Sequence, residues 1–199
     1  MSELIFACEG AGQQSYHRVS RKEYYEGDYA ILPGEDVSVR IEKGLDSAYS
    51  VINLRSSTQL KFRRTWQHIR RDHADVSVFW FVKRGNIALS QSGGKSVIGR
   101  DQCLITRSAQ PFHMDCLRDG DGDLEMLHVV VPTHIVRAHI PVHIGTGASF
   151  ATHEGDCRVA LRIFELLYQE GDAISHKAAD GLAGEAVGAI GSVLHSPRY

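Results

Sequence analysis

Residues 81–113, FVKRGNIALSQSGGKSVIGRDQCLITRSAQPFH, place a turn signal at nearly even intervals between short strand-like runs. Glycine interrupts the stretch at Gly85, at Gly93 and Gly94, and at Gly99, and each run between these turns is about as long as one crossing of a sheet. Apolar and polar residues alternate within the runs, as they do in antiparallel strands that cover a core with one face. This rhythm predicts a small antiparallel barrel.

Strand signals continue on both sides of this stretch. Residues 76–82 are apolar at almost every position, which predicts a central strand buried on both faces. The strands end at Pro132, because proline cannot donate to a ladder, and residues 133–152 are expected to form a connection with a short helical turn. Residues 1–34 are polar and contain several tyrosines, and we interpret them as an irregular lead-in. The same criteria mark further strand candidates at residues 37–42, 49–54, 61–69 and 124–131.

The period of the apolar residues changes after the last strand. Apolar residues then recur every three or four positions, which predicts helices over residues 156–169 and 177–194. Asp156 and Ser175 stand where the N-cap of each helix is expected, because their side-chain oxygens accept hydrogen bonds from free backbone N–H groups.

The second predicted helix carries four glycines, each of which costs about 1 kcal/mol relative to alanine. Close approach of another helix over a bare stripe would offset this cost. The alternative is a weak helix that frays. The glycines are Gly181, Gly184, Gly188 and Gly191.

The two helices together offer an apolar stripe larger than one wall of a barrel needs. We therefore expect a barrel domain, residues 1–152, followed by a helical dimerisation arm, residues 153–199, that builds a two-fold homodimer. The expected core of this dimer interface is Leu161, Phe164, Leu182, Ile190 and Val193.

Residues 50–167 resemble the cupin-type sensor domain of AraC-type transcriptional regulators. The resemblance rests on a Gly93-Gly94-Lys95 hairpin, a Gly99-Arg100-Asp101 turn and a Pro111-Phe112-His113 segment, and it continues through residues 64–68, 72–75 and 129–132. It implies a mainly β, cupin-like double-stranded β-helix, or jelly roll. It also implies a small-molecule effector pocket inside the barrel, whose ligand state biases a partner DNA-binding domain. The family's paired helix-turn-helix units are absent after residue 170, so we expect no specific DNA binding by this chain alone.

The basic segment at residues 61–71 is the main candidate for ligand recognition. Strand alternation would place Phe62, Arg64, Trp66, His68 and Arg70 on one face. Aromatic surface beside guanidinium donors suits an anionic or hydroxylated small molecule. The alternatives are a solvent-facing strand on which arginine stacks over Trp66, and nucleic-acid binding. The expected ligand-binding residues are Arg64, Trp66, His68, Arg70, Trp80, His113 and His128.

Eleven histidines raise the question of a metal site. Metal-dependent cupins use two histidines one residue apart, and no His-x-His occurs in the sequence. His68 and His73 are five apart and would face opposite sides of a strand. We therefore expect no metal, no cofactor and no catalytic residue, with a small cupin-like isomerase or oxygenase as the alternative function. The run at residues 119–123, DGDGD, is too short for a calcium loop and predicts a hairpin loop.

Composition narrows the class of protein further. The 199 residues carry a formal net charge of −2, so the chain has no basic field of the kind that binds phosphate backbones. Four cysteines without a CxxC pair predict reduced thiols. No signal-peptide pattern and no stretch of about 18 apolar residues is present, which predicts a soluble cytoplasmic protein.

Overall fold

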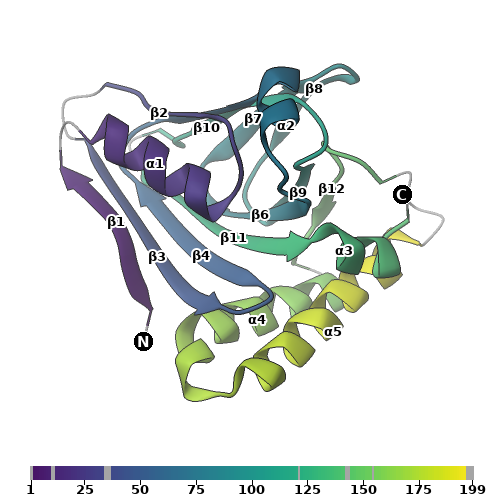
Figure 1. Cartoon of the computed structure of the whole chain (residues 1–199). Helices are drawn as coiled ribbons and strands as arrows, with labels where there is room; N and C mark the ends of the chain where they lie inside the picture. Colours follow the sequence, from purple (N-terminus) through teal and green to yellow (C-terminus); the bar gives the residue numbers. More distant parts are fainter. Residues whose placement is uncertain are drawn as a thin grey trace.

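The computed structural model describes residues 2–9, 12–33, 37–120, 122–141, 144–153 and 155–195. Within these residues two antiparallel sheets face each other, and helices pack on the outer face of the larger sheet (Figure 1). The larger sheet has the strand order β1 (Glu3–Glu9), β3 (Ser38–Asp46), β4 (Ser50–Ser56), β11 (Leu124–Pro132), β6 (Val76–Arg84), β9 (Gln102–Arg107) and β12 (Ser149–Ala151). The smaller sheet has the order β2 (Asp28–Ile31), β5 (Leu60–Arg64), β10 (Phe112–Leu117), β7 (Asn86–Gln91) and β8 (Gly94–Ile98).

Two hydrophobic cores hold these layers together. One fills the space between the two sheets. The other lies between the larger sheet and three helices: α3 (Thr133–His139), α4 (Gly155–Glu170) and α5 (His176–Leu194). Figure 1 shows α4 and α5 side by side beneath the larger sheet. The predicted jelly-roll barrel with two C-terminal helices is therefore confirmed.

The central strand β6 is buried on both faces, as its sequence predicted. Trp80 packs between the two sheets, whereas Phe79 and Phe81 pack in the core between the larger sheet and the helices. Strands β11 and β9 flank β6 on its two sides. A strand between two apolar layers has no polar face, which explains its unbroken apolar run.

The turn signals of the sequence fall between strands. Gly94 pairs with Gln91 where β7 and β8 form a hairpin. Gly85 joins β6 to β7 with a φ of 85°, and a Cβ at this position would lie 2.5 Å from the Leu117 carbonyl oxygen. Both the backbone angle and the close approach therefore require glycine.

The N-terminal segment is not the irregular lead-in that we expected. Within it the structure has β1, the helix α1 (Gln13–Glu23) and β2. The buried stripe of α1 consists of Tyr16, Ser20 and Glu23, which have helical spacing but read as polar residues. We call residues 13–31, which comprise α1, the connection after it and β2, the N-terminal plug, because their tyrosines pack into the barrel interior.

The segment at residues 61–69 is not one strand. Strand β5 ends at Arg64, and a short helix α2 (Trp66–Arg71) follows. Thr65 caps this helix: its side chain accepts from the His68 N–H, and its own N–H donates to Nδ1 of His68. This capping box stops the strand, so the expected alternation of faces holds for Phe62 and Arg64 and fails beyond them.

The two C-terminal helices begin and end within one residue of the predicted bounds. Ser175 caps α5 by accepting from the Ala178 N–H, as predicted, whereas Asp156 lies in the first turn of α4 and is not its cap. The helices are not a free arm. Phe164 and Ile190 are fully buried against the chain's own sheet. These two residues are therefore not available for the dimer interface that we expected them to form.

The glycines of α5 allow close approach, but within the same chain. A Cβ on Gly191 would lie 2.1 Å from the carbonyl oxygen of His139, at the end of α3. A Cβ on Gly188 would lie 3.4 Å from the ring of the same histidine, and one on Gly184 would lie 3.3 Å from the Tyr49 hydroxyl. The end of α3 and the β3–β4 connection therefore pack closely against the glycines of α5.

Candidate functional site

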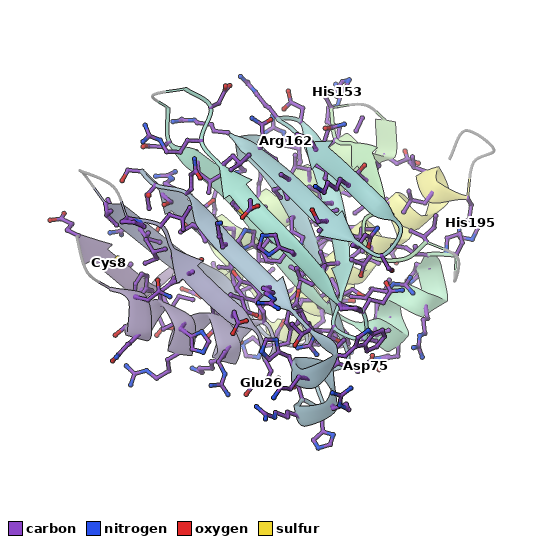
Figure 2. The ribbon with its side chains drawn as sticks, turned by 90° about the horizontal axis from the view of Figure 1, so that it is seen from above. Cys8, Glu26, Asp75, His153, Arg162 and His195 are labelled. Atoms are coloured by element: carbon purple, nitrogen blue, oxygen red, sulfur yellow. The ribbon has the colours of Figure 1, made fainter. Side chains whose placement is uncertain are left out.

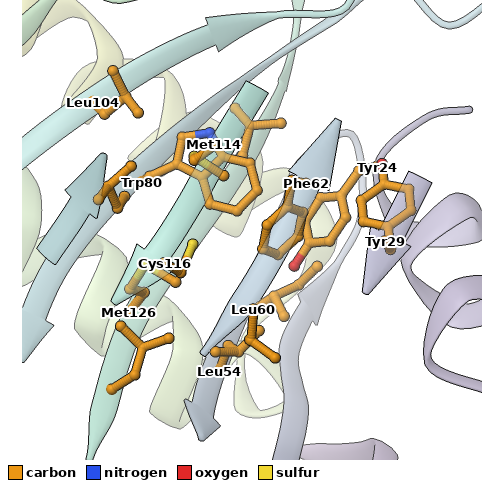
Figure 3. Packing of buried hydrophobic residues seen from close by; sticks show 14 of the residues in the cluster. Tyr24, Tyr29, Leu54, Leu60, Phe62, Trp80, Leu104, Met114, Cys116 and Met126 are labelled. Atoms are coloured by element: carbon orange, nitrogen blue, oxygen red, sulfur yellow. The ribbon is translucent and has the colours of Figure 1, made fainter. Parts of the chain in front are cut away.

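The barrel interior contains a cluster of aromatic and polar side chains. Trp80 and His128 are direct neighbours on β6 and β11, and their ring centroids lie 4.3 Å apart. The Trp80 indole N–H donates to the Thr106 hydroxyl at 2.8 Å, and the Tyr25 hydroxyl lies 3.2 Å from the same oxygen. The strands therefore place an indole, an imidazole and a hydroxyl in one apolar space. Figure 3 shows Trp80 beside Phe62, with Tyr24 and Tyr29 further along the same core.

The imidazole of His128 has one satisfied nitrogen. Its Nδ1 lies 2.6 Å from the Tyr24 hydroxyl, whereas its Nε2 is buried without a hydrogen-bond partner among the described residues. Burial lowers the pKa of His128 to about 3, so the ring is neutral at physiological pH. A neutral imidazole offers one donor and one acceptor, and a buried nitrogen without a partner destabilises the site. The interior therefore has a polar contact available to a small molecule.

Arg64 anchors the plug at one end of the barrel. The residue is 2% exposed, and its guanidinium donates to the Ser108 carbonyl at 2.6 Å and to the Asp72 carboxylate at 3.0 Å. It also donates to the Glu26 carbonyl and lies 4.5 Å from the ring centre of Tyr25. Figure 2 labels Glu26, whose backbone joins α1 to β2. Arg64 thus ties the plug to the barrel wall.

Asp72 completes this anchor. Its carboxylate accepts from the backbone N–H of Glu26 and of Ala74, each at 2.9 Å, in addition to Arg64. Burial acts to raise the pKa of Asp72, but these hydrogen bonds together with the positive charge of Arg64 lower it overall. The buried guanidinium therefore has an ionised partner at neutral pH.

The plug makes one further contact with the larger sheet and one between its own two elements. Lys43 on β3 lies 2.5 Å from the carboxylate of Glu23 at the end of α1. Gln13 joins the start of α1 to β2, because its amide donates to the Tyr29 carbonyl at 2.6 Å and accepts from the Ile31 N–H at 2.7 Å. Lys43 therefore ties the end of α1 to the larger sheet, whereas Gln13 joins α1 and β2, the two elements of the plug, to each other.

A groove lies at one end of the inner strands of the smaller sheet, where α2 follows β5. Its volume is about 330 Å³. The end of β5, the start of α2, the β7–β8 turn and the start of β10 meet here because β5, β10 and β7 are neighbours in the sheet. We call this depression the rim groove; its walls include Arg63, Trp66, Gln91, Ser92, Pro111 and His113.

The expected ligand-binding residues are divided among three places. Trp80 and His128 meet in the interior, and Trp66 and His113 meet in the rim groove. Arg64 is occupied as an anchor, although it also lines the groove. The remaining two lie on α2, where His68 caps its own helix and lies 3.7 Å from Asp28, and Arg70 is exposed.

Sequence reasoning missed the tyrosines of the plug. Tyr16, Tyr24, Tyr25 and Tyr29 are all buried in the core between the sheets. The signal was four tyrosines within fourteen residues of a segment otherwise dominated by charged and polar groups. Tyrosine combines a large apolar ring with a hydroxyl, so it can fill a barrel and also reach a polar partner.

The described ranges hold no group of three or more histidine, cysteine or acidic side chains that could bind a metal ion. The DGDGD run lies between β10 of the smaller sheet and β11 of the larger sheet, so it connects the two sheets and is not the hairpin loop that we expected. Its central Asp121 falls outside the described residues. No helix in the described part of the chain is both long and apolar enough to cross a membrane.

No family model and no curated protein matches the sequence. Among solved structures, the AraC-like transcriptional activator CuxR is similar to this chain with a TM-score of 0.71 at 7% sequence identity, covering 96% of this chain and 70% of CuxR. A cupin domain of an XRE family transcriptional regulator from Enterobacter cloacae aligns with a TM-score of 0.35 at 10% identity, covering 47% of this chain and 95% of that one. A cupin-superfamily sugar phosphate isomerase from Silicibacter pomeroyi gives 0.34 at 15% identity, covering 48% of this chain and 60% of that one. The likeness to CuxR establishes that the two chains share a fold, as the resemblance implied.

Proposed function

We propose that this chain is the effector-sensing, dimerising domain of an AraC-like transcription regulator and that it is not an enzyme. The observation that carries the proposal is the fold shared with CuxR over nearly the whole chain. A regulatory domain of this kind needs an internal contact for a small molecule, an element that responds to it and a surface that joins two copies. Particular residues of this chain suit each of these roles.

The internal contact is the pair formed by Trp80 and His128. The phenol of Tyr24 already lies against both rings, with centroid distances of 5.5 Å to Trp80 and 5.6 Å to His128. Tyr24 belongs to the plug, so the chain places one of its own side chains where an effector would bind. A compact effector with a ring and a hydroxyl would replace this phenol and take over its contact with Nδ1 of His128. The plug is then the element that responds to it.

The two tryptophans give a direct test of effector binding in ¹⁵N-labelled protein. Small molecules that co-purify with the protein are identified by mass spectrometry and added back. The indole N–H signal of Trp80 is expected to shift, and amide exchange across residues 13–31 is expected to accelerate as the plug is displaced. Compounds that bind but leave the Trp80 signal and the exchange of the plug unchanged would contradict an interior effector site.

The exposed face of α4 is the surface that we propose for dimerisation. Val159 and Leu166 are 54% and 50% exposed and lie two turns apart, so they share one face of the helix. Arg158 lies near the start of α4 and Glu170 at its end, and neither has an ion pair within the described part of the chain. An antiparallel two-fold contact would bring Val159 onto Leu166 of the copy and bring these opposite charges together.

Sedimentation of charged variants tests this surface. Leu166→Asp is expected to shift a dimer to monomer, because it places carboxylates against an apolar contact. Val97→Asp is the matched control, since Val97 is 71% exposed on β8, far from α4 in the fold. A wild-type chain that sediments as a monomer at tens of micromolar, or a Leu166→Asp variant that stays dimeric, would exclude α4 as the interface.

Specific DNA binding is assigned to a partner domain and not to this chain. The supporting observations are the net charge of −2 and the position of both long helices, which are packed against the sheet and present no basic face. A gel-shift titration should show only weak, salt-sensitive binding. A specific complex with a defined operator at sub-micromolar protein would overturn this assignment.

A further inference from the structure

The rim groove combines an exposed aromatic ring with an uncompensated positive charge. Trp66 is 58% exposed and is the exposed one of the chain's two tryptophans. Arg63 is exposed on β5 and has no ion pair within the described ranges. Both residues line the same depression. An indole left in water beside a free guanidinium is unusual on a protein surface, where large apolar side chains are mostly covered.

The carboxylates on the strands beside β5 contact side chains other than Arg63. Arg63 pairs in register with Asp28 on β2 and with His113 on β10. The Asp28 carboxylate lies 3.7 Å from His68, and the Asp115 carboxylate contacts both His113 at 3.2 Å and Lys61 at 3.7 Å. The residues that line the groove themselves include no carboxylate. The groove therefore attracts an anion.

We propose that the rim groove is a second binding site, which takes a planar aromatic anion of one or two rings. The ring stacks on Trp66, and the carboxylate or phosphate of the ligand accepts hydrogen bonds from Arg63. Gln91 and Ser92, on the opposite wall, supply further polar contacts. A volume of about 330 Å³ is large enough for two fused rings with one anionic group. This site lies outside the barrel, and its lining includes neither Trp80 nor His128 of the proposed interior effector site.

The two indole N–H signals separate the two sites. Trp80 is buried and bonded to Thr106, whereas Trp66 is exposed in the groove. The probes are 2-naphthoate and 2-naphthyl phosphate, titrated into ¹⁵N-labelled protein. We expect the Trp66 signal to shift with saturation while the Trp80 signal stays in place. A shift of the Trp80 signal alone would place the probe in the interior and overturn the groove site, and so would the absence of any shift at millimolar probe.

Matched probes and variants test each half of the recognition. Cyclohexanecarboxylate lacks the aromatic face and 2-naphthalenemethanol lacks the charge, so each should bind at least about tenfold more weakly than 2-naphthoate. Arg63→Gln should cause a similar loss, whereas Arg100→Gln, at an exposed arginine of the β8–β9 turn, should cause none. Equal binding of 2-naphthoate to Arg63→Gln and wild type would contradict the proposal. Both arginines are exposed, so both variants should fold, which the unchanged Trp80 signal verifies.

Discussion

The hydroxyl of Tyr24 lies 2.6 Å from Nδ1 of His128, a residue 104 positions later in the chain. Tyr24 stands at the end of α1 in the plug, and His128 is fully buried on the central strand β11. This contact joins the plug to a fully buried polar group of the barrel. The protein's response to pH and to small molecules should therefore depend on this pair.

The first prediction concerns pH. The pKa of His128 is lowered to about 3 in the folded protein, against 6.5 for a free histidine, because burial disfavours the charged ring. The unfolded chain therefore binds more protons between these two values, so stability is fully present above pH 6.5 and decreases as the pH falls toward 3. Urea unfolding at pH 7.5 and pH 4.5 measures this decrease. His128→Gln, which does not titrate, should lose less free energy of unfolding between the two pH values than wild type; an equal loss would contradict the assignment.

Arg64 should contribute to stability as an anchor of the plug. Arg64→Ala leaves Asp72 without its buried partner and should reduce the free energy of unfolding by about 3 kcal/mol. It should also increase amide exchange in residues 13–31. Arg63→Ala, next to it on the same strand but exposed, should change stability by less than about 0.5 kcal/mol. Similar effects for the two arginines, or unchanged exchange in the plug, would refute the anchoring role.

Ile190 should behave as a core residue of the folded chain. Ile190→Asp buries a charge between α5 and the larger sheet and should reduce stability by at least about 3 kcal/mol, so that thermal unfolding shifts strongly. Leu182→Asp, at a leucine of α5 that is 39% exposed, should cost less than about 1 kcal/mol. If Ile190→Asp unfolded at the wild-type temperature but sedimented as a monomer, α5 would form a dimer interface instead.

Two glycines of α5 should respond in opposite directions to the same change. Gly191→Ala would place a methyl group 2.1 Å from the His139 carbonyl oxygen and should destabilise by about 1–3 kcal/mol. At Gly181 the new Cβ would have no described atom within 4 Å apart from its chain neighbours and the backbone of its own helix, so Gly181→Ala should stabilise by up to about 1 kcal/mol. Chemical denaturation of both variants checks the prediction. Stabilisation by Gly191→Ala would show that α3 does not approach α5 as closely as described.

The sequence predicted the parts of the fold whose signals are local. The glycine turns of residues 81–113, the apolar run of β6 and the 3.6 period of α4 and α5 each report structure within one window. The helix of the plug was not predicted, because the buried face of α1 consists of tyrosine, serine and glutamate, which do not form an apolar pattern. The end of β5 at Arg64 was not predicted either, because the residues of the capping box, Thr65 and His68, also fit the alternating pattern of a strand.

The candidate site was predicted only in part for a physical reason. Trp80 and His128 were chosen from buried strands, and strand pairing makes them neighbours. The role of Arg64 depends on Asp72 and on the Ser108 carbonyl, 44 residues away, and no local pattern reports contacts at that distance. The same holds for the phenol of Tyr24, which reaches His128 from the other end of the chain.

The most direct test of the account asks whether the interior is a binding site that Tyr24 now fills. Tyr24→Ala removes the phenol and should leave a cavity beside Trp80 and His128, at a cost of about 3–5 kcal/mol. Phenol supplied in solution should then restore the contact with Nδ1 of His128. We predict that phenol raises the unfolding temperature of Tyr24→Ala and shifts its Trp80 indole signal, that toluene does so less, and that wild type responds to neither. If phenol stabilises wild type and Tyr24→Ala equally, or leaves the Trp80 signal of the variant unchanged, the interior is a packed core and not an effector site.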